Sequence, residues 1–200
     1  MTALPRRSTM SVEEYLQLDR SSIDTRYEYI DGHVIMMAGG TLDYATIGAN
    51  IISILRNLLR GSSCRVFTTD ARVRISETRY VYPDVSVSCD TQDRGRVDIV
   101  QFPRLIVEVL SPSTEATDRG RKLANYRQCP TVQEYMLVNY QYQSVELYRR
   151  EKNTLWTYHV FEADDDIELA SVGVRFPVTA VYEDVVFPQA SQREWVKAIL

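Results

Sequence analysis

Apolar side chains recur along this chain with two periods, one typical of strands and the other of a helix. Residues 43–60 carry apolar side chains at Ile47, Ile51 and Leu55, four positions apart. This spacing places them on one face of a helix, so we expect an amphipathic helix that packs on a sheet. Gly61 follows directly, and glycine is typical of the residue that closes a helix.

Two short signals organise the N-terminal part of the chain. Ser11 and Glu14 have the spacing of a capping box, which predicts a short helix that runs to about Leu18. Asp31-Gly32 separates two strand-like runs and predicts a hairpin turn. We therefore expect a helix followed by a β-hairpin whose second strand covers residues 33–38.

The rest of the chain is dominated by the alternation and the short apolar runs that are typical of strands. Residues 104–110 form an apolar run with one glutamate, as expected for a central strand buried on both faces. A helix is expected over 117–128. Further strands are expected at 65–69, 71–75 and 80–88, in a meander of 133–139, 143–149 and 154–160, and more weakly over 167–187, with a short helix at best in the last ten residues.

Length and composition indicate an ordinary globular protein. The chain has 200 residues, of which 44% are hydrophobic and 25% charged, with no internal repeat or low-complexity tract. We therefore expect one α/β domain over residues 1–200. No apolar run approaches the roughly 20 residues of a membrane span, and the first ten residues lack the apolar core of a signal peptide. A cytoplasmic protein is expected.

Charge and cysteine usage narrow the function classes. The net charge of −4 disfavours a protein that coats nucleic acid, although a carboxylate site that first holds cations is compatible with it. Cys64, Cys89 and Cys129 are widely spaced, so we expect three reduced thiols rather than a disulfide framework or a zinc site. The two histidines stand apart, which excludes a zinc enzyme based on several histidines.

Glu108 is the first candidate for chemistry, because it lies in the middle of the apolar run 105–110. A buried carboxylate is costly unless it is paired or bound to a metal. The alternative is an edge strand on which Glu108 faces water.

Asp84 is the second candidate, and it follows Pro83 inside a strand-like run. Proline within a strand marks an edge or a bulge, and bulges often lie beside active sites. Two antiparallel neighbours would bring Asp84 and Glu108 together. A Pro-Asp pair is otherwise an ordinary turn signal.

Lys122 is the third candidate, four residues after Asp118 on the helix that follows Glu108. Near the two carboxylates, its ammonium would orient an attacking water or neutralise charge on a phosphorane. The alternative is an exposed ion pair between Asp118 and Lys122. Arg119, Arg121 and Arg127 flank Lys122 and would hold phosphates, or else form a solvated helix face.

Together these residues resemble the PD-(D/E)xK nuclease superfamily and, within it, the bacterial family of uncharacterised restriction endonucleases. Asp84 matches the first acid and Glu108 the second. The usual third position is Leu110 here, and Lys122 matches a lysine that has migrated to the next helix. The similarity extends from about residue 10 to 160 and rests on residues 27–32, 82–86, 105–114 and 118–126, with Glu134-Tyr135.

The resemblance implies a restriction-endonuclease-like αβββαβ core, with a mixed central sheet flanked by helices and a C-terminal β meander. It implies hydrolysis of phosphodiester bonds in nucleic acid, foremost DNA, by an endonuclease that uses Mg²⁺ or Mn²⁺ held by Asp84 and Glu108. It adds Glu28 as a further acid near the metal, and a homodimer. Family members often carry a histidine at the start of the first long helix, where this chain has Tyr44-Ala45-Thr46.

Two other functions are compatible with the same residues. One is a binding or scaffold protein with a degenerate site, which the missing lysine at Leu110 and the acidic net charge favour. The other is an enzyme that acts on a small molecule with a carboxylate pair, as a glycosidase does, although a glycosidase needs no lysine.

Overall fold

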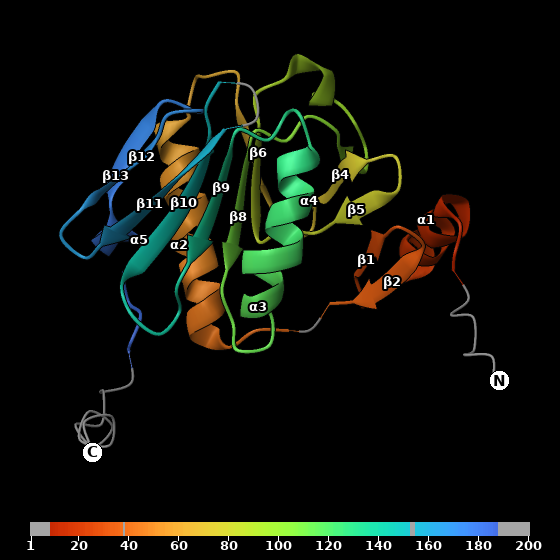
Figure 1. The fold of residues 1–200 in the computed structure, drawn as a ribbon, viewed down its shortest axis with the longest axis horizontal. Helices are drawn as coiled ribbons and strands as arrows, with labels where there is room; N and C mark the ends of the chain where they lie inside the picture. Colours follow the sequence, from red (N-terminus) through yellow and green to blue (C-terminus); the bar gives the residue numbers. More distant parts are fainter. Residues whose placement is uncertain (1–8, 38, 153–154, 188–200) are drawn as a thin grey trace.

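The computed structural model describes residues 9–37, 39–152 and 155–187 of the chain. It contains two large mixed β-sheets, a small hairpin and helices on the outer faces, which confirms the expected mixed α/β architecture (Figure 1). The helices are α1 (Val12–Ser21), α2 (Leu42–Leu58), α3 (Glu115–Thr117), α4 (Leu123–Gln128) and α5 (Val178–Val181), with short turns of other helix types at Thr91–Asp93 and Asp118–Lys122.

The five-stranded sheet has the order β2-β1-β5-β4-β7 and the six-stranded sheet the order β11-β10-β9-β8-β6-β3. Only the pairs β4–β7 and β8–β9 are parallel among the strands that the structure describes. The strands are β1 (Tyr27–Ile30), β2 (His33–Met36), β3 (Arg65–Thr68), β4 (Arg72–Ser76), β5 (Arg79–Val81), β6 (Val85–Ser88), β7 (Ile99–Val100), β8 (Leu105–Val109), β9 (Glu134–Val138), β10 (Ser144–Arg150), β11 (Trp156–Glu162), β12 (Asp166–Leu169) and β13 (Val174–Pro177).

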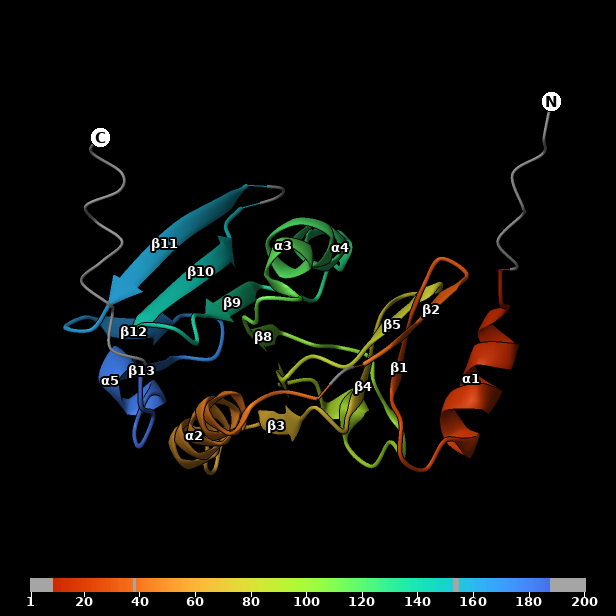
Figure 2. The ribbon, with the colours of Figure 1, turned by 90° about the horizontal axis from the view of Figure 1, so that it is seen from below.

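The six-stranded sheet buries apolar side chains on both faces. Helix α2 covers one face and the helical segment of α3 and α4 covers the other (Figure 2). Within β8, Val107 points towards Ile47 and Ile51 of α2, whereas Ile106 packs with Tyr126 of α4. This double burial explains why the sequence of β8 is apolar without alternation.

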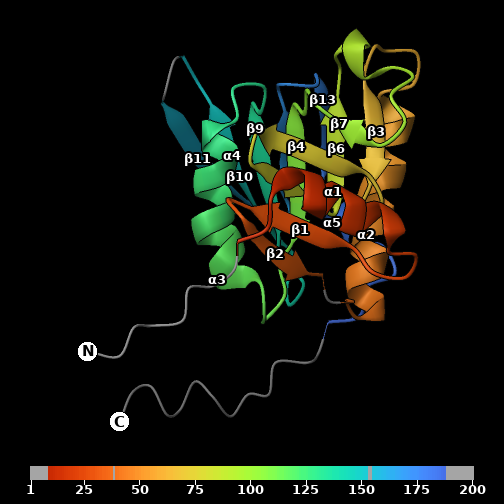
Figure 3. The same ribbon diagram turned by 90° about the vertical axis from the view of Figure 1, so that its right-hand side faces the viewer.

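The predicted N-terminal elements are confirmed. Ser11 caps α1, because its hydroxyl accepts a hydrogen bond from the amide of Glu14 while the Glu14 carboxylate accepts one from the amide of Ser11. Asp31 and Gly32 have φ angles of 48° and 91°, the left-handed conformation that a two-residue hairpin turn requires. Helix α1 lies against the resulting hairpin (Figure 3), held by stacked Tyr15 and Tyr29.

The prediction of one continuous strand over residues 80–88 is wrong in one respect. This segment is divided into β5 of one sheet and β6 of the other, and Tyr82-Pro83-Asp84 forms the connection. Proline has no amide hydrogen and cannot continue a ladder. The alternation on either side hides this break, because both halves remain extended.

The helix expected over 117–128 is confirmed, but it is not uniform. It begins as α3, continues as a π-helical turn over Asp118–Lys122 and ends as α4. The meander of β9, β10 and β11 is also confirmed, and β12 and β13 form the hairpin that follows it. The helix expected at the C-terminus lies outside the described residues.

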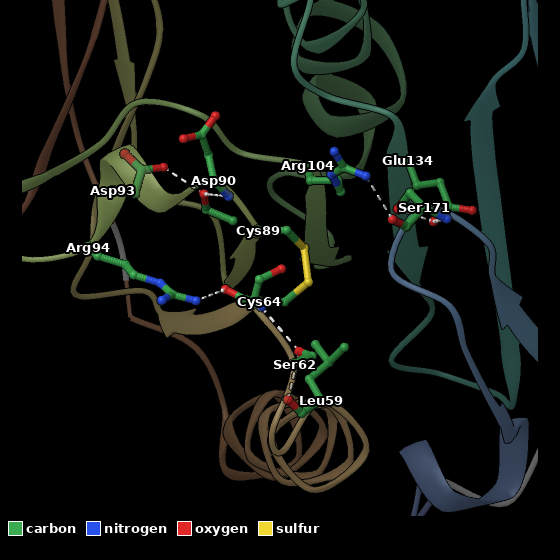
Figure 4. Close-up of a disulfide and its surroundings, with 12 residues drawn as sticks. Leu59, Ser62, Cys64, Cys89, Asp90, Asp93, Arg94, Arg104, Glu134 and Ser171 are labelled. Atoms are coloured by element: carbon green, nitrogen blue, oxygen red, sulfur yellow. Dashed lines mark hydrogen bonds between the residues drawn. A yellow bond between two sulfur atoms is a disulfide. The ribbon is translucent and has the colours of Figure 1, made fainter.

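The expectation of three reduced thiols is wrong. Cys64 and Cys89 form a disulfide (Figure 4), whereas Cys129 is free and buried. Arg65 pairs with Ser88 in the antiparallel ladder of β3 and β6. The residues one position further along, Cys64 and Cys89, therefore lie directly opposite each other. Their separation of 25 residues gave no indication of this contact.

Among the described residues, no helix combines the length and the apolar character that crossing a membrane requires.

Opening the disulfide should lower the free energy of unfolding. A bridge that closes a loop of this length restricts the unfolded chain, so Cys64→Ser should cost about 3 kcal/mol under oxidising conditions. Urea unfolding with and without reductant measures the effect, and reductant should not change the stability of Cys64→Ser. A wild-type stability that is unaffected by reductant would contradict this role for the bridge.

Candidate active site

Asp84 and Glu108 lie side by side at the junction of the two sheets. Val85 of β6 pairs with Val107 of β8, so Asp84, the residue before β6, is opposite Glu108. Directly opposed residues on antiparallel strands have their side chains on the same face. The backbone amide of Val109 also donates a hydrogen bond of 2.7 Å to Oδ2 of Asp84. The predicted proximity of the two acids is therefore confirmed.

Glu108 is buried in a central strand, with 3% of its surface exposed, so the alternative of a water-facing glutamate on an edge strand is wrong. Its Oε1 atom accepts hydrogen bonds from Nζ of Lys122 at 3.0 Å and from the hydroxyl of Tyr126 at 2.8 Å. Both donors come from the helical segment that covers this face of the sheet.

Lys122 lies at the centre of a group of acids. Its Nζ atom is 3.2 Å from Oδ1 of Asp118 and 3.9 Å from Oε1 of Glu28, in addition to its bond with Glu108. Asp118 is 1% exposed, so the alternative of an exposed Asp118–Lys122 pair is also wrong. Both residues belong to the π-helical turn, a local irregularity that is frequent at functional sites.

Glu28 joins this group from β1 of the other sheet. It is buried, and its Oε1 atom accepts a hydrogen bond of 3.3 Å from the amide of Tyr82, next to Pro83. The structure thus gathers all four residues expected from the sequence, Glu28, Asp84, Glu108 and Lys122, although they come from four separate segments of the chain.

Burial and mutual repulsion shape the electrostatics of the site. Burial raises the pKa of Glu108 to about 8; Lys122 opposes this shift, and Asp84, Asp118 and Glu28 add to it. Burial also raises the pKa of Asp84. Burial alone would lower the pKa of Lys122, but Glu108, Glu28 and Asp118 outweigh it and raise that pKa above its ordinary value. One ammonium therefore faces more acids than it can neutralise.

This charge imbalance fits a divalent cation. Among the described residues there is no group of three or more histidine, cysteine or acidic side chains arranged to hold a metal ion. The candidate ligands are the two opposed carboxylates of Asp84 and Glu108. Mg²⁺ commonly takes one or two carboxylates and completes its shell with water and substrate phosphates. Both protein hydrogen bonds of Glu108 end on Oε1, so Oε2 is the oxygen available to a cation.

A cavity of about 590 Å³ opens onto these carboxylates. Its walls include Met36 and Met37 from the end of β2 and the loop that contains Pro112. Arg121, next to Lys122, is exposed at its rim, whereas Arg119 is occupied by ion pairs with Glu115 and Glu146.

Three further residues belong to the site but were not assigned to it from the sequence. Tyr44 donates a hydrogen bond to Oδ1 of Asp84, Tyr126 donates one to Glu108, and Asp118 contacts Lys122. The four-residue spacing of Asp118, Lys122 and Tyr126 is typical of one helix face, and it is the signal in the sequence that connects Asp118 and Tyr126 with Lys122. No pattern in the sequence connects Tyr44 with Asp84, which lies 40 positions away.

Comparison with known proteins gives a consistent result. A solved structure from Anabaena variabilis, described as "a putative nuclease belonging to DUF820", superposes on this chain with a TM-score of 0.72. The two sequences are 20% identical, and the match covers 88% of this chain and 99% of the other. This similarity supports the fold. Two uncharacterised Synechocystis proteins are similar in sequence: slr1290 at 37% identity over 89% of this chain and 94% of its own length, and sll1609 at 30% over 74% and 84%.

The model of the Uma2 family, described as "Putative restriction endonuclease", matches residues 12–179. That range includes both sheets and every residue of the site described above. The chain therefore belongs to the Uma2 family.

Proposed function

We propose that this protein is a Mg²⁺- or Mn²⁺-dependent endonuclease that hydrolyses phosphodiester bonds of nucleic acid. One observation carries the proposal: Asp84 and Glu108 lie opposite each other, and the ammonium of Lys122 is bonded to Glu108 beside an open cavity. Two carboxylates and one lysine supply a cation site and a fixed positive charge, which phosphodiester hydrolysis needs.

Each residue of this chain has a separate task in the proposed reaction. Asp84 and Glu108 would hold the cation, which would lower the pKa of a bound water and offset charge on the phosphate. Lys122 positions the attacking water or stabilises the negative charge that develops on phosphorus. Tyr126 fixes the carboxylate of Glu108, while Glu28 and Asp118 fix the ammonium of Lys122.

We further propose DNA as the substrate, a cytoplasmic location and action as a homodimer. A dimer of this chain would provide two sites, one for each strand of a duplex. Tyr158 and Val160 are exposed on β11, the edge strand of the six-stranded sheet, and make its surface the candidate interface.

A binding protein with an inactive site is the alternative function. It is favoured by Leu110, a buried apolar residue at the position where the family pattern usually has lysine. Because Lys122 brings an ammonium to Glu108 from the neighbouring helical turn, the proposal of an active nuclease is the better supported of the two.

Replacement of Glu108 tests the proposal directly. Glu108→Ala should abolish binding of Mn²⁺ in calorimetry and, with it, cleavage of plasmid DNA and RNA. The fold should persist, since Asp118 and Glu28 still pair with Lys122. Glu77→Ala, which removes an exposed glutamate, is the matched control and should behave as the wild type.

The two measurements separate the possible outcomes. Cleavage by Glu108→Ala at the wild-type rate would rule out the assigned site. A wild-type protein that binds Mn²⁺ and cuts neither DNA nor RNA would support the inactive binding protein instead.

Replacement of Lys122 should separate metal binding from chemistry. Lys122→Met removes the ammonium and retains the apolar stem and both carboxylates, so saturating Mn²⁺ should still fill the site. The cleavage rate at saturating Mn²⁺ should fall by about 100-fold or more, because a preorganised charge at the phosphate is lost. Equal rates for the two proteins in single-turnover assays would contradict this role.

Arg121 should contact the phosphate backbone from the rim of the cavity. In a Glu108→Ala background, which prevents cleavage, Arg121→Ala should weaken DNA binding and reduce the slope of log affinity against log salt by about 1. Arg175→Ala is the matched control, since Arg175 is an exposed arginine on β13 that pairs with Asp166 and does not line the cavity. Fluorescence anisotropy over a NaCl series measures both, and identical slopes would exclude Arg121 from the interface.

A further inference from the structure

Tyr44 reaches the candidate metal ligands from an element that contributes no other residue to the acid group. It is the third residue of α2, and its hydroxyl donates a hydrogen bond to Oδ1 of Asp84. The other carboxylate oxygen, Oδ2, accepts from the amide of Val109. Two donors on opposite sides therefore fix the orientation of the Asp84 carboxylate.

The ring of Tyr44 is itself held in place. A Cβ atom on Gly40 would lie 2.5 Å from Cδ1 and 2.7 Å from Cγ of Tyr44, so the ring packs directly on a backbone that has no side chain. At the start of α2, the Thr41 hydroxyl accepts a hydrogen bond of 3.3 Å from the amide of Tyr44. The neighbouring Gly39 differs, because a Cβ atom there meets nothing within 4 Å.

We propose that Tyr44 is a positioning residue that holds Asp84 in the orientation required to bind the catalytic cation. This inference rests on the proposed nuclease function and adds a residue to it. An ionised carboxylate offers about four acceptor positions on its two oxygens. One donor on each oxygen therefore leaves room for the cation while preventing the group from rotating.

The inference assigns the effect of Tyr44 to Asp84 and not to the nucleic acid. Groups that orient metal ligands typically change metal affinity or activity by about 10- to 100-fold when they are removed. Loss of the Tyr44 hydroxyl should therefore weaken the cation site, and a higher cation concentration should compensate for the loss. A residue that touches the substrate would not be rescued in this way.

The test compares four proteins by Mn²⁺ calorimetry without nucleic acid: the wild type, Tyr44→Phe, Gly40→Ala and Gly39→Ala. Tyr44→Phe should weaken Mn²⁺ binding by about 10- to 100-fold. Gly40→Ala should weaken it as well, because the new methyl group displaces the ring, and Gly39→Ala should not. The melting temperature without metal checks that each variant folds, and cleavage by Tyr44→Phe should return to the wild-type rate at saturating Mn²⁺.

Two outcomes would overturn the inference. If Tyr44→Phe binds Mn²⁺ as tightly as the wild type, Tyr44 does not position Asp84, and a cleavage rate that then stays low at saturating Mn²⁺ would assign its effect to the substrate. If the wild type itself binds no Mn²⁺, the proposed function fails and the inference fails with it, which distinguishes that case from the first.

Discussion

The site depends on the burial of several carboxylates around the single ammonium of Lys122. Glu108, Asp118 and Glu28 come from different elements, and each lies within 4 Å of Nζ of Lys122. Without that ammonium, the pKa of Glu108, which burial raises to about 8, would rise further. The helical segment that carries Lys122 must therefore remain packed on the sheet. The hydrogen bond from the Tyr126 hydroxyl to Glu108 helps to hold this segment in place. Stability and function are coupled at this point.

The junction between the two sheets makes the arrangement possible. Pro83 ends one extended segment, so that β5 belongs to one sheet and β6 to the other, and Asp84 lies where they part. At that junction β1 contributes Glu28 and β8 contributes Glu108. A single continuous sheet would carry these acids in one row. The break instead lets them converge on Lys122 from both sheets and leaves a cavity beside them.

The sequence predicted the elements whose signals are local, and much of the site. The capping box at Ser11, the turn at Asp31 and the helical period of α2 depend on neighbouring residues, and all are confirmed. The proximity of Asp84 and Glu108 was also predictable, because an apolar strand with one acid demands a partner. The Cys64–Cys89 bridge, the division into two sheets and the contact of Tyr44 with Asp84 were not, since each depends on strand register or on contacts distant along the chain.

Glu134 shows why burial alone does not identify a functional acid. It lies opposite Leu105 on β9, the strand next to Glu108, and is completely buried. Its two oxygens accept hydrogen bonds from Arg149, from the amide of Ala170, and from the amide and hydroxyl of Ser171, so its charge is satisfied within the fold. Glu108 receives its protein donors on Oε1, and it faces the cavity. Two buried glutamates on adjacent strands thus differ in what surrounds them, and we assign the proposed chemistry to the one whose second oxygen is open to a cation.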